Sequence, residues 1–323
     1  MKNILIFKTD KLGDLLNISP IINNIKINYP NCLITLVCSS YNYSIAKYYS
    51  KDLNIVVSSD SIITFLIKNF KSLFLTKYDV LLQLDGKNRS YLSSIFITAN
   101  KKLCIKFHKK KRIFKKLFTI VRPNIFISSF FDFTENSFED YNLPNNKNYH
   151  YLSLYLKLLS KVNIKVIDKK HYFPLDNILN IHKSSKDYFY VHIDQRWDKF
   201  NSTIYDNFYE KISLLSVQNK IIISSNLGGN IFFNNLKKNL QNNINIDFYN
   251  GPELNQIISL IYSSKVCISS HSGLIVHAAA AFNKYIIDIV PKNIFNELDR
   301  WIPFEAKYKR FDINNFPDFD FKF

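Results

Sequence analysis

The sequence predicts an α/β protein of two domains with parallel sheets, and three features support this prediction. The chain has 323 residues, more than the roughly 250–300 at which a single hydrophobic core stops growing. Short apolar runs alternate with stretches of helical spacing in both halves, as in sheets covered by helices. The turns after several of these runs carry glycine and polar residues, and open α/β sheets bind ligands at such turns. We place the boundary between domains 1–170 and 171–323.

The elements follow one another in a regular order. The first strand is expected over residues 4–7, before a glycine turn and a helix that reaches residue 28. Further strands of this half are expected over 32–38, 55–57, 80–84 and 103–107, with helices over 43–49, 62–75, 91–98 and 149–159. In the second half, strands are expected over 188–193, 220–224, 244–248, 266–269 and 285–290, with helices over 204–216, 230–240, 254–263 and 274–282.

Two segments lack a clear pattern. Residues 128–148 are polar and acidic, and we expect a loop there. The tail 312–323 alternates Asp with Phe, which makes it a candidate for a return to the first domain.

The formal net charge of +17 has two interpretations. It indicates an anionic partner, or it reflects the bias toward Asn, Ile, Lys, Phe and Tyr that an AT-rich genome produces. We interpret the densest basic run, residues 109–116 (KKKRIFKK), as a solvated loop or helix face. The alternative is a patch for an anionic lipid surface, with Phe107, Phe114 and Phe118 beside the lysines. No recognition helix or RNP-like aromatic pair is evident, so nucleic-acid binding is not expected.

Several classes of protein are disfavoured by missing motifs. The four cysteines lack CxxC spacing, which favours buried free thiols over a zinc site or disulfides. No GxGxxG, Walker A or HExxH pattern occurs, which argues against a dinucleotide oxidoreductase, a P-loop ATPase or a metalloprotease, and no metal is required. No apolar run approaches the ~18 residues that span a bilayer. We expect a cytoplasmic protein, or one held at the cytoplasmic face of a membrane.

Glycine is rare enough to be informative. The chain has six glycines, less than a third of the average usage of about 7%. They fall in or beside turns next to expected strands and mark candidate site loops: Gly13, Gly86, Gly228, Gly229, Gly251 and Gly273.

The first of these loops lies in residues 8–20 (KTDKLGDLLNISP). It places Gly13 and Asp14 after the first strand, where a ligand of an open α/β sheet is expected. Asp14 can act there as a helix cap or as a catalytic base. One carboxylate can do both, because it has roughly four lone-pair sites.

A second candidate site lies in residues 268–273 (ISSHSG), where a strand passes into a helix. Free N–H groups at the helix start, with Ser270, Ser272 and Gly273, suit the diphosphate of a nucleotide. Ordinary capping by serine is the alternative. Two further loops, at Asn226 to Gly229 and at Gly251, end neighbouring strands on the same edge of the sheet and favour a nucleotide pocket.

Four segments together resemble the heptosyltransferase family of inverting glycosyltransferases (glycosyltransferase family 9, the ADP-heptose:lipopolysaccharide type). They are residues 8–20, 78–90 (YDVLLQLDGKNRS), 251–263 (GPELNQIISLIYS) and 266–287 (VCISSHSGLIVHAAAAFNKYII), in the order and at the spacing of the family. The resemblance implies a GT-B fold of two facing Rossmann-like domains. The first would lie on the acceptor side, and the second would bind the nucleotide sugar.

The resemblance also assigns residues. It makes Asp14 the general base that takes the proton of an acceptor hydroxyl, and a basic residue, Arg196 or by slight preference Lys199, the partner of the leaving diphosphate. The full donor-side set is Arg196, Lys199, Asn226, Gly228, Gly251, Ser270, His271, Ser272, Gly273 and His277. The acceptor-side set is Lys11, Gly13, Asp85, Lys87 and Arg89.

The chain departs from the family pattern at two histidines. His271 stands where the family has an acid before the Ser/Thr-Gly pair, which leaves the donor sugar open. His277 follows Gly273 by four residues where the family has a histidine at three. We therefore expect His271 to contact the donor, whereas His277 is either a ligand group or a packed core histidine.

The sequence thus predicts a metal-independent inverting glycosyltransferase without a cofactor. It would move a heptose or related sugar from a nucleotide-diphosphate donor, with an ADP-sugar favoured, to a lipopolysaccharide-type or other cell-envelope glycan. The partners expected are this donor, an anionic glycolipid or glycan acceptor, and a peripheral contact with the inner membrane. The alternative is a non-catalytic sugar-nucleotide or glycan-binding protein of the same fold.

Overall fold

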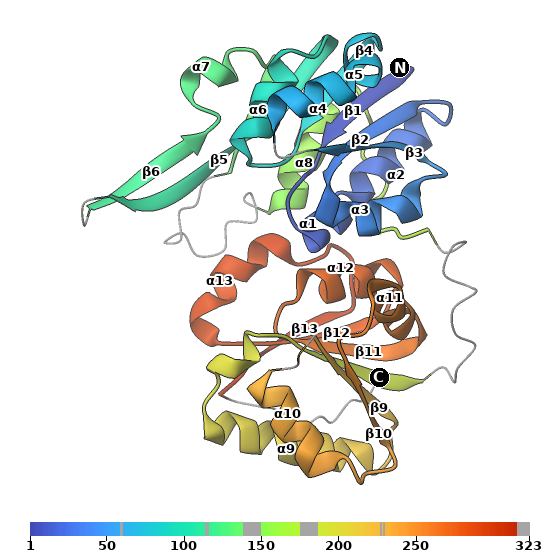
Figure 1. Cartoon of the computed structure of the whole chain (residues 1–323), viewed down its shortest axis with the longest axis vertical. Coiled ribbons are helices and arrows are strands. Elements are labelled where there is room, and N and C mark those ends of the chain that lie inside the picture. The colour runs from blue at the N-terminus through green and yellow to red at the C-terminus, as the bar shows by residue number, and fades with distance from the viewer. Residues whose placement is uncertain are drawn as a thin grey trace. The chain divides into compact units, whose positions relative to one another are not determined.

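The computed structural model describes residues 1–58, 61–113, 116–137, 150–174, 187–226, 228 and 230–314, without the side chains of residues 109–119. The chain divides into two compact units, Met1–Lys169 (unit 1) and Lys170–Phe323 (unit 2), one residue from the expected boundary (Figure 1). Each unit has its own sheet with helices. The predicted α/β fold class is confirmed.

The sheet of unit 1 has the strand order β3-β2-β1-β4-β5-β6, and β7 pairs with β5. Its strands are β1 (Asn3–Phe7), β2 (Leu33–Ser39), β3 (Leu53–Ser58), β4 (Tyr78–Gln83), β5 (Ala99–Ile113), β6 (Lys116–Arg122) and β7 (Phe133–Ser137). The central strand β1 is parallel to both neighbours, with Leu5 between Thr35 of β2 and Leu81 of β4. Its continuous apolar run is buried because helices cover both faces of such a sheet.

The helices of unit 1 cover these two faces. They are α1 (Leu12–Leu16), α2 (Ser19–Asn28), α3 (Ser40–Ala46), α4 (Ile62–Lys68), α5 (Phe70–Phe74), α6 (Asn88–Ile95), α7 (Ile125–Ser128) and α8 (Tyr151–Ser160). Right-handed crossovers place α2 and α3 on one face and α4, α5 and α6 on the other. In agreement, α8 packs on α2, β5 and β7, whereas α6 packs on α4 and α7.

The sheet of unit 2 is parallel throughout, in the order β10-β9-β8-β11-β12-β13. Its strands are β8 (Tyr188–Ile193), β9 (Ile221–Ser225), β10 (Ile246–Asn250), β11 (Ser264–Ser269), β12 (Tyr285–Val290) and β13 (Tyr308–Asp312). Its helices are α9 (Ser202–Ser216), α10 (Ile231–Leu240), α11 (Leu254–Ser263), α12 (Gly273–Ala281) and α13 (Phe295–Leu298).

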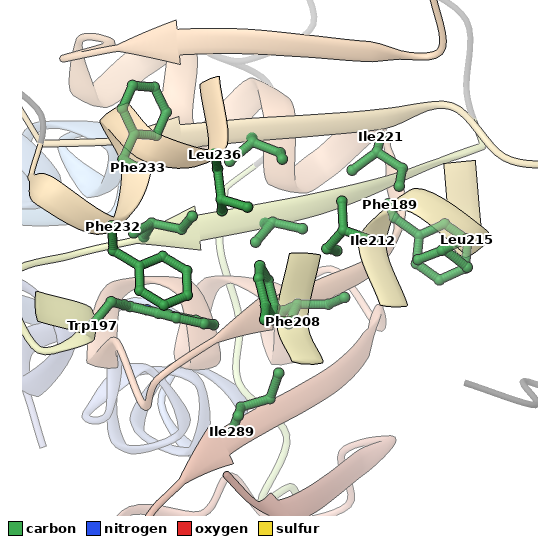
Figure 2. Packing of buried hydrophobic residues seen from close by; sticks show 14 of the residues in the cluster. Phe189, Trp197, Phe208, Ile212, Leu215, Ile221, Phe232, Phe233, Leu236 and Ile289 are labelled. Atoms are coloured by element: carbon green, nitrogen blue, oxygen red, sulfur yellow. The ribbon is translucent and has the colours of Figure 1, made fainter. Parts of the chain in front are cut away.

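Trp197 lies in the core that α9 and α10 form against this sheet (Figure 2). Its side chain is fully buried, with ring centroids 4.9 Å from Phe208 and 5.1 Å from Phe232. The short 3-10 turn Trp197–Lys199 that carries it begins soon after β8, beyond residues 194–196. The packing of this one ring therefore fixes the course of the chain after β8, where donor-side residues were predicted.

The basic run 109–116 is a correction to the sequence prediction. The backbone of residues 109–113 belongs neither to a helix nor to a loop, because the 15-residue strand β5 continues through it and pairs antiparallel with β6 (Figure 1). Lysine has a low strand propensity, so the pattern did not indicate this ribbon. Phe107, which the alternative interpretation placed beside a lipid surface, is buried and stacked on Tyr151 with ring centroids 5.8 Å apart. The side chains of Phe114 and Phe118 lie outside the described residues.

Other boundaries also differ from the predictions. Part of the expected loop 128–148 forms β7, and residues 138–149 lie outside the described part of the chain. The expected helix 62–75 is two helices, α4 and α5, divided at Asn69, whose side chain bonds back to the carbonyl of Phe65. Strand β13 was not predicted, and of the tail only 312–314 is described. The four cysteines are free and buried, as expected.

Replacing Trp197 with alanine is expected to lower the free energy of unfolding of unit 2 by about 3–5 kcal/mol, because a cavity would remain in a packed core. Trp197→Phe should cost clearly less, since Nε1 of Trp197 has no hydrogen-bond partner among the described residues. Chemical denaturation followed by circular dichroism measures both variants. Equal stability of the alanine variant and the wild type would contradict this role of Trp197.

Candidate functional site

In each unit, the chain order across the sheet reverses at one place and brings two loops together. In unit 1, β1 lies between β2 and β4, and in unit 2, β8 lies between β9 and β11. Ligands of open α/β sheets bind outside the carboxyl ends of the strands at such switch points. Asp14 and Asp85 follow β1 and β4, whereas Arg196 and His271 follow β8 and β11. Residues predicted from separate motifs thus converge on two sheet edges.

Asp85 ties together the two loops at the edge of unit 1. Its buried carboxylate accepts hydrogen bonds from the backbone N–H of Thr9 at 2.9 Å and from the hydroxyls of Thr9 at 2.7 Å and Ser90 at 3.0 Å. The side chain of Gln83 and the N–H of Lys87 donate to its other oxygen, each at 3.0 Å. Burial raises the pKa of Asp85. A contact of Asp85 with an acceptor would require some of these bonds to break.

Lys8 is a buried cation at the same edge, and sequence reasoning did not assign it. Its ammonium donates to the carboxylate of Asp10, the carbonyl of Leu84 and the hydroxyl of Tyr155, each at 3.0 Å. Burial opposes the charged form, but Tyr155, Asp10 and Asp14 outweigh it and raise the pKa of Lys8. A lysine directly after an apolar strand was a usable signal, whereas Tyr155, distant on α8, had none.

Asp14 combines the two roles that the sequence left open. It lies in the first turn of α1, and its Oδ2 accepts the backbone N–H of Lys11 at 3.2 Å. Burial raises the pKa of Asp14, Lys8 lowers it and Asp10 raises it again, with a raised value as the result. Within the described residues this carboxylate accepts no other hydrogen bond. Asp14 therefore caps α1 while keeping one oxygen uncommitted, and the raised pKa makes it a stronger base than an ordinary aspartate.

The other predicted acceptor-side residues surround this edge at different depths. Lys11 is exposed and precedes α1, whereas Gly13 is buried within α1. Lys87 precedes α6, and its ammonium donates to the carbonyl of Thr9, so it bridges the two loops. Arg89 is half-buried in α6. The structure thus brings Lys11 and Lys87 to the two loops of the edge.

At the edge of unit 2, Arg196 links the loops after β8 and β11. Its guanidinium is held in a forked pair by the carboxylate of Asp194, with Nε 2.9 Å from Oδ2, and Nη2 also donates to Oδ2. Nη1 donates to the carbonyl of His271 at 2.6 Å. The side chain remains 44% exposed. Arg196 is therefore fixed in place and still open to solvent, while Lys199 is exposed and has no such anchor among the described residues.

His271 is held by a buried carboxylate behind it. Asp288 of β12 accepts the backbone N–H of His271 and faces its Nδ1, both at 2.5 Å. The hydroxyl of Tyr308 donates to the same carboxylate at 2.6 Å, and Arg310 donates to Tyr308 at 3.0 Å. Burial and the Asp288 carboxylate raise the pKa of Tyr308, which keeps its hydroxyl a donor.

The backbone of His271 has φ 51°, in the left-handed region that a residue with a side chain rarely adopts. The two bonds to Asp288 compensate for this conformation, and such strain is typical of functional sites. With Nδ1 turned to Asp288, Nε2 is the atom of the ring that remains for a ligand.

The N-terminus of α12 carries the predicted anion site. The side chain of Ser272, which precedes the helix, makes no capping hydrogen bond. The N–H groups of Gly273, Leu274 and Ile275 make no hydrogen bond within the described residues. By contrast, Asn201 and Asn230 cap α9 and α10. Of the two interpretations of residues 268–273, anion binding and serine capping, the geometry favours the first.

Three donor-side residues lie after the neighbouring strands of unit 2. Asn226 and Gly228 follow β9, and Gly251 follows β10, so the three share the carboxyl edge of the sheet with the α12 loop. Gly228 and Gly251 have φ of 87° and 64°, in the left-handed region that glycine adopts most readily. Their contacts with a nucleotide stay predictions.

His277 is buried one turn into α12, and its ring stacks on that of His171 at 4.8 Å. This arrangement favours the packed core histidine over the ligand group.

The residues that sequence reasoning missed at this edge are Asp194, Asp288, Tyr308 and Arg310. Asp288 had a signal, because it is the only charged residue in the apolar strand β12 (YIIDIV) and a buried carboxylate needs partners. Tyr308 and Arg310 lie on the unpredicted strand β13 and had none. Among the described residues, no group of three His, Cys, Asp or Glu side chains is placed to hold a metal ion. Nor does any described helix have the length and apolar character that a bilayer crossing requires.

No model of a known protein family matches the sequence, and no curated protein matches it either. Several solved structures are similar to the structure of this chain. E. coli heptosyltransferase WaaC with ADP is 14% identical, with a TM-score of 0.70 over 96% of this chain and 93% of that one. A family 9 glycosyl transferase from Veillonella parvula is 13% identical, with a TM-score of 0.69 over 96% and 86%. E. coli ADP-heptose lps heptosyltransferase II is 14% identical, with a TM-score of 0.64 over 96% and 90%. The chain has the fold of these heptosyltransferases, so the fold that the sequence resemblance implied is confirmed.

Replacing Asp288 with asparagine should release the ring of His271. In the wild type we expect the neutral ring of His271 to carry its proton on Nδ1, which faces Asp288. The neutral ring of free histidine carries its proton mainly on Nε2. Nitrogen-15 NMR of the imidazole above neutral pH should therefore show a change of tautomer in Asp288→Asn. Tyr308→Phe keeps the carboxylate and should keep the Nδ1 proton. The same tautomer in the wild type and Asp288→Asn would contradict this role of Asp288.

Proposed function

We propose that the chain is an inverting glycosyltransferase that uses a nucleotide-diphosphate sugar. The observation that carries the proposal is the division of chemistry between the two switch points. A carboxylate with a raised pKa and an uncommitted oxygen lies at one, and uncapped N–H groups with a fixed arginine lie at the other. A general base and an anion-binding helix start are the two parts that a single displacement at a sugar requires.

On the acceptor side, Asp14 takes the proton from a hydroxyl group as that oxygen attacks the anomeric carbon of the donor. Burial destabilises the ionised carboxylate, and protonation during the reaction relieves this cost. Lys11 and Lys87 supply positive charge for phosphate or carboxylate groups on the acceptor, with Gly13, Asp85 and Arg89 as the further predicted contacts. The chemistry of these cations suits an anionic glycolipid or glycan of the cell envelope.

On the donor side, the bond between the anomeric carbon and the diphosphate breaks, and its electron pair leaves with the phosphate oxygen. The N–H groups at the start of α12 and the guanidinium of Arg196 stabilise that charge. Attack from the opposite side of the ring gives inversion. The reaction needs no resident cofactor, since the donor brings its own leaving group and the protein supplies positive partners for it.

His271 bears on the identity of the donor. Where the family places an acid, this chain offers Nε2 of a ring that Asp288 orients. Such a nitrogen can accept from a sugar hydroxyl when neutral, or donate to a phosphate when protonated. A heptose or a related sugar carried by ADP is the favoured donor, in line with the ADP and ADP-2-deoxy-2-fluoro heptose named with the WaaC structures.

The alternative, a sugar-nucleotide-binding protein without turnover, rests on the same departure at His271. Binding of a nucleotide sugar with no transfer to any envelope acceptor would favour it. The support of His271 by Asp288 and Tyr308 is more consistent with an altered donor contact than with a decayed site.

The proposal is tested with Asp14→Asn. Loss of a general base should lower kcat by about 10²–10⁴-fold, measured as release of the nucleoside diphosphate in the presence of acceptor. Thermal stability at neutral pH should not fall, because the raised pKa means that the ionised carboxylate is disfavoured in the folded state and asparagine removes that charge. The matched control is Asp52→Asn, which should keep full activity. Asp52 lies in a turn before β3, at the amino ends of the strands, whereas Asp14 lies at their carboxyl ends.

The pH dependence of the activity provides a second test of Asp14 as the general base. Because Asp14 acts in its ionised form and its pKa is raised, activity of the wild type should fall on the acid side at a pH above the ordinary range of aspartate. The residual activity of Asp14→Asn should lack this acid limb. Equal turnover of Asp14→Asn and wild type would remove Asp14 from the mechanism.

A further inference from the structure

One surface of unit 1 exposes apolar side chains that its own fold does not cover. We call it the apolar face and define it by Ile63 and Ile67 of α4, Phe70 of α5, Phe96 at the end of α6, and Ile125 and Phe126 of α7. These side chains are 54% to 90% exposed. In the described part of the chain, the three phenylalanines that are more than half exposed all lie on this face. Contiguous apolar surface of this kind marks an interaction site.

The residues of the apolar face come from neighbouring helices. Helix α4 packs against α5 and α6, and α6 packs against α7. Figure 1 shows α4, α5 and α6 on the same side of the sheet, with α7 beside the base of the β5–β6 hairpin. The exposed side chains of the face therefore come from one group of helices that pack on one another.

Compositional bias does not account for this surface. An excess of Ile and Phe from base composition would act on both halves of the chain alike. Unit 2 exposes aliphatic residues such as Val217 beside Leu214 at the end of α9, Ile231 and Ile244, and no phenylalanine more than half exposed among its described residues. Among the described residues, the phenylalanine rings that are more than half exposed are thus confined to one face of one unit.

The helices of the apolar face carry charge of one sign. None of the helices α4, α5, α6 and α7 contains an acidic residue, while Lys68 and Lys71 are exposed beside the apolar side chains. The β5–β6 hairpin, which leads through Arg122 into α7, carries the basic run KKKRIFKK. Apolar side chains flanked by lysines, without acids, complement a bilayer surface that contains anionic lipids.

We propose that the apolar face is a docking surface for an anionic lipid bilayer. The isoleucine and phenylalanine side chains enter the boundary between headgroups and acyl chains, and Lys68 and Lys71 lie at the headgroups. This inference goes beyond the proposed transfer reaction and does not depend on it, because lipid binding requires neither donor nor acceptor. If the protein transfers a sugar, this contact would hold unit 1 at the surface where a glycolipid acceptor is embedded.

The test is cosedimentation of the full chain with vesicles of phosphatidylcholine, with and without phosphatidylglycerol. We expect binding to the anionic vesicles that weakens as salt is raised, and weaker binding to the neutral ones. The variant Ile67→Asp/Phe96→Asp/Phe126→Asp should lower the partition coefficient by at least about tenfold, since each lost side chain contributes roughly that factor when fully buried. The control Val217→Asp/Ile231→Asp/Ile244→Asp adds the same charge to unit 2 and should bind like wild type.

A second variant keeps the apolar side chains. Lys68→Glu/Lys71→Glu should weaken binding to the anionic vesicles and leave binding to neutral ones unchanged. All substituted residues are exposed, so circular dichroism should show wild-type folding. Equal vesicle binding by the wild type and the apolar-face variant would overturn the proposal. So would a shift from dimer to monomer in that variant without lipid, because the face would then be an interface between two copies of the chain.

Discussion

A carboxylate that is fully buried, such as that of Asp288, has to be surrounded by donors, since burial of an unpaired charge costs several kcal/mol. In unit 2 these donors are the N–H and Nδ1 of His271 and the hydroxyl of Tyr308. They fix the loop after β11 in a conformation that it would not adopt alone, with His271 in the left-handed region. The carbonyl of His271 then anchors Arg196. The arrangement of the donor-side edge therefore depends on one acid in an apolar strand.

The edge of unit 1 follows the same rule with a different outcome. The carboxylate of Asp85 accepts hydrogen bonds from the loops after β1 and β4 and joins them. The ammonium of Lys8 uses its three hydrogen bonds on Asp10, Leu84 and Tyr155. Asp14 is left as the carboxylate with an uncommitted oxygen and a raised pKa. Two edges built alike thus offer opposite chemistry. One presents a base, and the other presents N–H groups and a guanidinium.

Much of the fold could be predicted from the sequence because its signals are local. The apolar run before Asp14, the helix starts and the β-α-β alternation are each recognised within a few residues, and they predict parallel strands in both halves. The β5–β6 hairpin and β13 could not be predicted in this way. The strand character of β13 comes from pairing with β12, which lies on the other side of α13 in the chain. The strands of the hairpin are adjacent in the chain, but lysine has a low strand propensity, so their pattern did not indicate strands.

The residues of the candidate site also divide into those with a local sequence signal and those without one. Asp14, Arg196 and His271 could be found because they lie in short motifs at strand ends. Their partners Tyr155, Asp288 and Tyr308 come from other elements, and only packing brings them close. The role of Asp85 shows the converse, since its position in a motif indicated a ligand contact whereas the structure places its carboxylate inside a network of backbone and hydroxyl donors.

The central claim is that a nucleoside diphosphate binds at the edge of unit 2, against the start of α12. Hydrogen exchange of the full chain, measured by mass spectrometry with and without saturating ADP, tests this claim most directly. The account predicts slower exchange in peptides that cover residues 270–275 and 194–196, and unchanged exchange in peptides that cover residues 8–14. Protection confined to residues 8–14, or bound ADP that leaves residues 270–275 unprotected, would contradict it.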